Sequence, residues 1–119
     1  MHCFIAFYYL LELGGSMNCE FIREGELLTL KPRGDIDHHL SSNIRDEIDY
    51  YIYKYGIKDI LFDFANVNFM DSSGVGLIMG RYKKIKLIGG CIAVTNLRPG
   101  VERIFQISGL YKLVEIRRN

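Results

Sequence analysis

The stretch IKDILFDFANVNFMDSSGVGLIMG, residues 57–80, passes from a dense apolar run to a segment with helical spacing. Residues 57–64 have the character of a strand covered on both faces, where parallel strands usually lie. After residues 69–71, apolar side chains recur with the period of an amphipathic helix. The predicted inward face of this helix consists of Val75, Ile78, Met79, Tyr82 and Ile85. The stretch therefore predicts a buried strand followed by a helix.

The flanking segments continue this alternation. Upstream, extended runs over 18–23 and 26–33 predict a hairpin that turns at Glu24-Gly25. A helix that ends near Gly56 follows, and its apolar face consists of Leu40, Ile44, Ile48, Tyr51, Ile52 and Tyr55. Downstream, we expect a strand over 91–94, a helix from Pro99 to a stop at Gly109, and a last strand over 113–116. The order predicts an α/β sandwich, with a mostly parallel sheet led by a β-hairpin and helices packed on the sheet.

Length and composition narrow the possible functions. The chain has 119 residues, 49% of them hydrophobic and 24% charged, which is typical of one globular domain. Its formal charge of +1 gives no global field that would favour nucleic acid or an anionic membrane. Cys3, Cys19 and Cys91 are scattered and lack the spacing of a zinc site. Reduced thiols in a cytoplasm are the expected reading.

Residues 1–16 differ in character from the rest of the chain. The apolar run over 4–11 is too short to span a bilayer, no Lys or Arg precedes it, and Glu12 interrupts it. We therefore expect neither a signal peptide nor a membrane anchor. Met17 opens the first patterned strand, so residues 1–16 are interpreted as an extension or a start-site artefact, and residues 17–119 as the domain.

The two serines after Asp71 allow three chemical interpretations. A phosphate-binding glycine loop is weakly supported, because GxGxxxG is neither a P-loop nor the spacing that opens a dinucleotide fold. A nucleophilic serine would need the GxSxG elbow, which is absent, and a base from His2, His38 or His39. In the third interpretation, one serine only caps the helix.

Three glycines in the same helix argue for more than a cap. Gly74, Gly76 and Gly80 each destabilise a helix by about 1 kcal/mol relative to Ala. Their missing side chains would let a partner approach the helix start closely. A phosphate on Ser72 or Ser73 would meet the positive end of the helix dipole and would add about −1.5 to −2 charges beside Asp71. The pattern therefore fits a serine switch, although it does not choose between the two serines.

Two neighbouring charged segments have simpler interpretations as well. In GDIDHHL, residues 34–40, Asp35, Asp37, His38 and His39 could suggest a metal site, but adjacent histidines point in different directions. The alternative is a loop whose Asp37 caps the next helix. The basic residues Arg81, Lys83, Lys84 and Lys86 fall in the last turns of their helix, where cations complement the dipole. They predict a solvated helix end rather than a nucleic-acid patch.

Three motifs together resemble a known family. FMDSSGVGLIMGRYKKIKLIGG, the upstream GDIDHH and the downstream RPGVERIFQISGL are similar to the STAS family of anti-sigma factor antagonists, and most of all to its sporulation members that act on the forespore sigma factor, sigma F. The resemblance covers Met17 to about Ile116. It implies that Ser72 matches a phosphoacceptor that an anti-sigma factor with serine protein kinase activity modifies and a serine phosphatase restores.

The same resemblance implies a regulatory protein rather than an enzyme, with no catalytic residue, metal or cofactor. The unphosphorylated antagonist would bind the anti-sigma factor and free sigma, and phosphorylation would reverse this. The loop over 34–40 would lie beside the serine, in a partner-binding face of Asp35, Asp37, His38, His39, Asp71, Ser73, Gly74 and Gly76. The alternative is a small nucleotide-binding or hydrolytic α/β enzyme that uses the Asp-Ser-Ser turn.

Two features depart from the family pattern. Residues 1–16 have no recognised counterpart, and the chain ends at Asn119, where such domains commonly carry another helix. A sheet face without that helix makes self-association conceivable.

Overall fold

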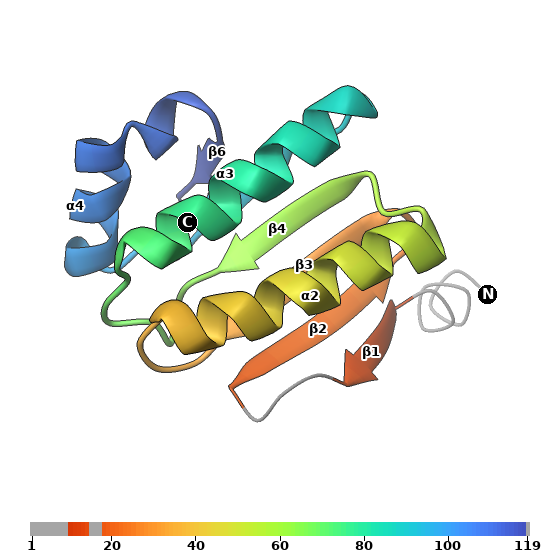
Figure 1. The fold of residues 1–119 in the computed structure, drawn as a ribbon, viewed down its shortest axis with the longest axis horizontal. Coiled ribbons are helices and arrows are strands. Elements are labelled where there is room, and N and C mark those ends of the chain that lie inside the picture. The colour runs from red at the N-terminus through yellow and green to blue at the C-terminus, as the bar shows by residue number, and fades with distance from the viewer. Residues whose placement is uncertain (1–9, 15–17, 119) are drawn as a thin grey trace.

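The computed structural model describes residues 10–14 and 18–118 and consists of one sheet with helices packed on it (Figure 1). The strand order is β1-β2-β3-β4-β5-β6, the order of the strands in the chain. The strands are β1 Leu10–Gly14, β2 Cys19–Glu24, β3 Leu27–Pro32, β4 Asp59–Asp63, β5 Ile92–Thr95 and β6 Glu115–Arg117. The α-helices are α2 His38–Tyr55, α3 Ser72–Leu87 and α4 Pro99–Ser108, and a short 3₁₀ helix, η1, spans Leu110–Lys112.

The sheet combines an antiparallel hairpin with parallel strands. β2 and β3 pair antiparallel, while β3, β4, β5 and β6 are parallel neighbours. Each parallel pair is joined by a helical crossover, and crossovers of one hand between successive neighbours place their helices on the same face. Figure 1 shows α2 and α3 lying side by side in front of the sheet. The predicted α/β sandwich with a mostly parallel, hairpin-led sheet is confirmed.

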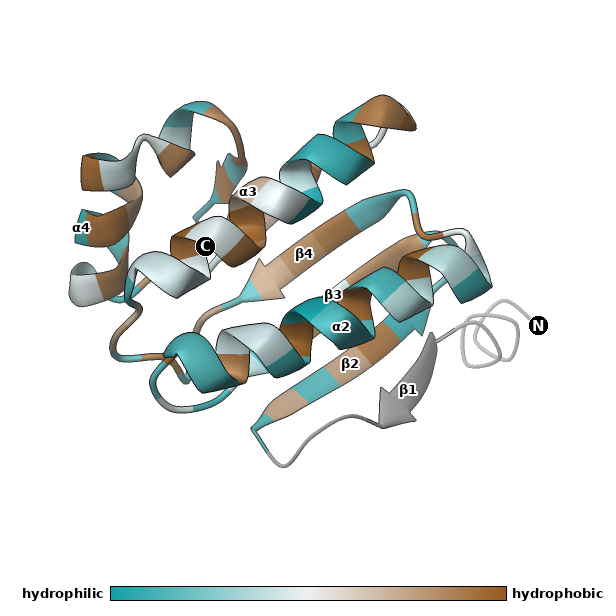
Figure 2. Ribbon diagram, in the orientation of Figure 1, coloured by the Kyte–Doolittle hydropathy of each residue, from teal (hydrophilic) through white to brown (hydrophobic). Residues whose placement is uncertain are grey.

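The core lies between the sheet and the helices. Its largest fully buried side chains are Phe21, Phe62, Phe64 and Phe105, with Leu28, Leu30, Ile36, Ile44, Ile48, Ile57, Ile60 and Met70. Figure 2 shows that the side of α2 away from the sheet is mainly hydrophilic. This amphipathic pattern matches the predicted helix, which ends at Gly56 in the left-handed conformation, with φ of 65°.

The prediction that strand 57–64 is covered on both faces is wrong. In β4, Ile60 and Phe62 are 1% and 0% exposed, whereas Asp59, Leu61 and Asp63 are partly exposed. The alternation shows that one face of β4 meets the helices and the other does not. Ile57 and Phe64 are also buried, but they lie just outside the strand. Counting them as strand residues made the sequence look apolar on both faces.

The structure has an additional strand that precedes the predicted hairpin in the chain. β1 pairs antiparallel with β2, with Leu10 opposite Glu24 and Gly14 opposite Phe21. This strand belongs to the segment 1–16, most of which lies outside the described residues. A folded unit that begins at Met17 therefore stays a prediction. At the other end, η1 occupies residues that precede the last strand, so β6 begins at Glu115 rather than at residue 113.

Candidate functional site

The site is formed by two loops that follow neighbouring parallel strands. The loop after β3 and the loop after β4 meet in a short parallel bridge between Ile36 and Met70. The backbone N–H of Ile36 donates to the carbonyl of Phe69 at 2.9 Å, and the N–H of Asp71 donates to the carbonyl of Ile36 at 3.2 Å. The carboxyl ends of parallel strands meet at one edge of a sheet, which brings the GDIDHH and MDSS segments together.

Asp71 caps the helix that carries the two serines. Its Oδ1 accepts a hydrogen bond from the backbone N–H of Ser73 at 2.8 Å and another from the hydroxyl of Ser73. The hydroxyl bond in particular lowers the pKa of Asp71. The interpretation that a serine caps this helix is therefore wrong: the aspartate is the cap, and Ser72 and Ser73 lie in the first helical turn.

The two serine hydroxyls lie in different surroundings. Ser73 is partly buried, and its hydroxyl makes two contacts. It donates to Asp71, and its Oγ lies 3.1 Å from Oγ of Ser41 on α2. Ser72 is exposed at the start of α3. The Ser72 hydroxyl is therefore accessible at the surface, whereas the Ser73 hydroxyl is engaged between two helices.

The segment 34–40 presents its polar residues to solvent. Asp35, Asp37, His38 and His39 are all exposed. Oδ1 of Asp37 accepts from the backbone N–H of Leu40 at 2.9 Å, which confirms the predicted cap of α2. Within the described part of the chain, no cluster of three or more His, Cys, Asp or Glu could hold a metal ion.

The glycines of α3 do not share one role. A Cβ on Gly74 would lie 2.6 Å from Sδ of Met70, and Gly74 is buried, so its missing side chain serves internal packing. Gly74 therefore does not belong to an exposed docking face, contrary to the prediction. Gly76 is exposed and Gly80 is partly exposed, and a Cβ on either would meet nothing within 4 Å.

Arg81 is the second correction on α3. Instead of standing in a solvated helix end, its side chain is 7% exposed and its Nε lies 3.0 Å from Oδ1 of Asp49 on α2. The local sequence showed a basic run, but it did not show that Asp49 lies opposite. Arg81 also lines a groove between α2 and α3 that Ser73 and Gly76 border.

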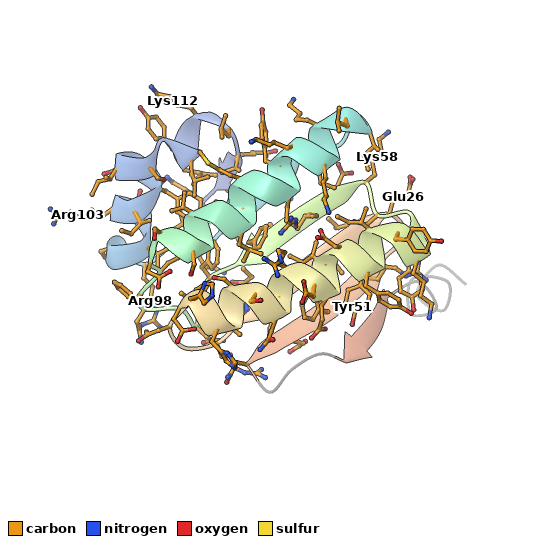
Figure 3. The ribbon with its side chains drawn as sticks, in the orientation of Figure 1. Glu26, Tyr51, Lys58, Arg98, Arg103 and Lys112 are labelled. Carbon is orange, nitrogen blue, oxygen red and sulfur yellow. The ribbon has the colours of Figure 1, made fainter. Side chains whose placement is uncertain are left out.

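Arg98 supports the loop before the serines. Its Nε donates to the carbonyl of Ala65 at 2.9 Å, and its Nη1 donates to Oδ1 of Asn68 at 2.8 Å. Figure 3 shows Arg98 near the loop end of the sheet. The motif RPGVERIFQISGL contained this arginine, but a sequence pattern does not reveal which distant carbonyl an arginine will bind.

Comparison with known proteins places these features in a family. Residues 18–119 match the STAS domain family. The anti-sigma F factor antagonist of Paenibacillus polymyxa is 40% identical over 93 residues, which cover 78% of this chain and 80% of that protein. The structure of the anti-sigma factor antagonist SpoIIAA in its unphosphorylated form is 33% identical, with a TM-score of 0.74, over 80% of this chain and 81% of that one.

The structure of the Bacillus cell fate determinant SpoIIAA in its phosphorylated form is also similar. It is 32% identical, with a TM-score of 0.66, and the likeness covers 80% of this chain and 84% of that one. None of the described helices of the present chain has the length and apolar character needed to cross a membrane.

Proposed function

Because the chain belongs to the STAS domain family, we propose that it is a cytoplasmic anti-sigma factor antagonist that is switched off by phosphorylation of Ser72. In its unphosphorylated form it binds an anti-sigma factor that is itself a serine protein kinase, and sigma is released. A serine phosphatase restores the active form. The similar proteins are named as anti-sigma factor antagonists, and one of them is described in a phosphorylated form.

The contrast between the two serines carries the choice of acceptor. Ser72 is exposed in the first turn of α3, whereas the hydroxyl of Ser73 donates to Asp71 and contacts Ser41. A kinase must bring the acceptor oxygen into its own active site, which an exposed hydroxyl allows without breaking the contact between the helices. The geometry therefore favours Ser72.

The electrostatics of the turn explain how a phosphate could act as a switch. The added group brings about −1.5 to −2 charges directly beside the Asp71 carboxylate. A partner surface that accommodates one carboxylate and a neutral hydroxyl would then face a concentrated negative charge, which costs like-charge repulsion and desolvation. The modification therefore weakens docking without any change of fold.

The docking face consists of exposed and partly exposed residues around this turn. Asp35, Asp37, His38 and His39 come from the loop after β3, and Asp71, Ser73 and Gly76 from the turn and α3. Phe69 adds an aromatic side chain that is 52% exposed in the same loop. An exposed aromatic residue beside charged groups is a frequent anchor of protein interfaces.

Kinase labelling of matched serine variants tests this function. The parent, Ser72→Ala and Ser73→Ala are incubated with the cognate anti-sigma kinase and ATP, and the phosphorylated peptide is identified by mass spectrometry. We expect one phosphate on the parent and on Ser73→Ala, and none on Ser72→Ala. Ser72→Ala should still bind the kinase, because it adds no charge.

Two outcomes would contradict the proposal. Normal labelling of Ser72→Ala together with loss in Ser73→Ala would move the acceptor by one residue, and normal labelling of both would exclude this turn as the switch. Ser72→Asp provides a further check, because one added charge should weaken binding, although less than a phosphate does.

A further inference from the structure

The groove between α2 and α3 is lined by groups that donate hydrogen bonds. It has a volume of about 200 Å³ and is open to solvent. We call it the interhelical groove, and its lining includes Ser41, Ser42 and Arg45 of α2 and Ser73, Gly76 and Arg81 of α3. Ser73 and Gly76 at its border also belong to the proposed docking face, but the switch gives the groove itself no role.

Arg81 lines this groove and carries donors that are not satisfied by hydrogen bonds. Its side chain is 7% exposed, and its Nε forms an ion pair with Oδ1 of Asp49 at 3.0 Å that lacks the geometry of a hydrogen bond. Its Nη1 is buried and has no hydrogen-bond partner among the described residues. A buried charged group that makes fewer hydrogen bonds than it can donate is costly, so the Arg81 guanidinium has donor capacity that its ion pair with Asp49 does not use.

A second guanidinium lines the same groove. Burial, and then the nearby positive charge of Arg45, lower the pKa of Arg81, while Asp49 acts in the opposite direction. The ion pairs along the groove join Arg81 and Lys84 to Asp49, and Arg45 to Asp46. In these pairs three cations share two carboxylates, and the carboxylate of Asp71, which is bonded to Ser73, is a third negative charge near the groove.

The serine hydroxyls add to the donor character. The hydroxyl of Ser73 donates to Asp71, so Ser41 can donate to Oγ of Ser73 across their 3.1 Å contact. Oγ of Ser42 accepts from Nη2 of Arg45 at 3.3 Å, which leaves the proton of Ser42 available. Guanidinium groups and a hydroxyl that converge on one groove match the acceptor oxygens of an oxyanion.

We propose that the interhelical groove binds a phosphate-type oxyanion through the guanidinium groups of Arg81 and Arg45 and the hydroxyl of Ser42. The phosphate has two possible sources, free inorganic phosphate or a phosphoryl group on Ser72 of the same chain. The second source rests on the proposed function. Gly76, which lines the groove, lies one helical turn after Ser72, and a Cβ there would meet nothing within 4 Å.

The test is a titration of the unphosphorylated full-length protein with inorganic phosphate, followed by NMR of the backbone amides and of the Arg81 Nε–H. Sodium chloride keeps the ionic strength constant. We expect saturable shifts confined to residues of the groove. Arg45→Gln should weaken the apparent affinity about tenfold, the loss expected for one charge-assisted hydrogen bond. Arg103→Gln, which removes an exposed guanidinium from α4 (Figure 3), is the matched control and should titrate like the parent.

The result that would overturn the inference is a parent protein without saturable shifts in the groove. An equal loss in Arg45→Gln and Arg103→Gln would overturn it as well, because the response would then reflect only overall charge. Both readouts use unphosphorylated protein, so they are independent of whether a kinase modifies Ser72.

A second arm identifies the source of the phosphate. If the group on Ser72 occupies the groove, phosphorylated protein shows the groove shifts without added phosphate and does not respond to more. If phosphorylated protein still titrates like the parent, the groove takes free phosphate. Either result supports the site and assigns its ligand.

Discussion

The hydroxyl groups of Ser72 and Ser73 belong to adjacent residues but lie in different surroundings: the first is exposed, and the second is hydrogen-bonded inside the protein. Asp71 caps α3, Ser73 joins the cap to Ser41 of α2, and Ser72 remains exposed. The polar contacts described at this turn are therefore made by Asp71 and Ser73, which flank Ser72. A phosphate on Ser72 would therefore disturb no packing, so under the proposed function it would change the free energy of partner binding rather than that of folding.

The two glycines that flank Val75 should respond oppositely to alanine. A Cβ at Gly74 would overlap Cγ of buried Met70, so Gly74→Ala should destabilise the protein by about 1–2 kcal/mol through overpacking. Gly76→Ala meets nothing within 4 Å and should stabilise α3 by up to about 1 kcal/mol. Urea unfolding of both variants measures the difference. Equal effects would show that Met70 moves aside freely.

Ionisation of the Cys19 thiol should make the free energy of unfolding depend on pH in the alkaline range. Burial of this thiol raises its pKa from 9.0 to about 12, so in the folded state it stays neutral where the unfolded chain ionises. Its contribution is complete below pH 9 and is lost as the pH rises through the range from 9 to 12. Between pH 8 and 10 the parent should lose about 1 kcal/mol more unfolding free energy than Cys19→Ala. Identical pH slopes in urea unfolding would contradict this burial effect.

At the scale of elements, the packing of α2 on α3 combines apolar burial with a charged contact. The carboxylate of Asp49 on α2 forms ion pairs with Nε of Arg81 at 3.0 Å and with Nζ of Lys84 at 2.9 Å. The Asp49 side chain is 29% exposed. A buried ion pair is weak evidence for net stability, but removal of one partner strands the other charge. This contact therefore fixes how the two helices that form the interhelical groove lie against each other.

A comparison of two aspartates on α2 tests that role. Asp49→Ala should destabilise the protein by about 2–3 kcal/mol, because it leaves the buried guanidinium of Arg81 without its carboxylate. Asp46→Ala removes an exposed pair with Arg45 and should change stability by less than about 0.5 kcal/mol. Thermal and urea unfolding of both variants provide the measurement. A small effect of Asp49→Ala would mean that Arg81 reaches solvent or another acceptor.

The sequence predicted the positions of helices and strands better than the contacts that their side chains make. The period of Leu40, Ile44 and Ile48 and the stops at Gly56 and Gly109 were sufficient to place two helices and their ends, because these signals are local. Arg81 and Gly74 were misinterpreted because the groups that decide their roles, Asp49 and Met70, lie outside their own helix or before its first turn. β1 was missed because residues 10–14 have no strict alternation, and pairing with β2 is a long-range contact.

At the scale of the whole molecule, the fold separates a helix-covered face of the sheet from an open one. Successive crossovers in the same direction bring α2 and α3 to one face (Figure 1), and on the other face Ile22, Thr29 and Leu61 remain partly exposed. The candidate site lies at the loop end of the strands. The site residues therefore depend on β3, β4 and the two long helices, and β1 lies at the far edge of the sheet.

This separation predicts the behaviour of a chain that begins at Met17. Residues 18–118 contain the buried core that runs from Cys19 to Val114, and the loops of the site follow β3 and β4. The shortened chain should therefore fold and bind the anti-sigma kinase as well as the full chain does. It loses the pairing of β1 with β2, which leaves the edge of β2 open to association with another chain.

Circular dichroism, urea unfolding and a binding titration compare the two chains, and size-exclusion chromatography over a range of concentrations detects association through the open edge. We expect matching spectra, matching affinities and more self-association in the shortened chain. Loss of cooperative unfolding would show that residues 1–16 are part of the folded unit. Loss of binding with the fold intact would show instead that the partner contacts residues 1–16, because the strands and helices that carry the site would be unchanged.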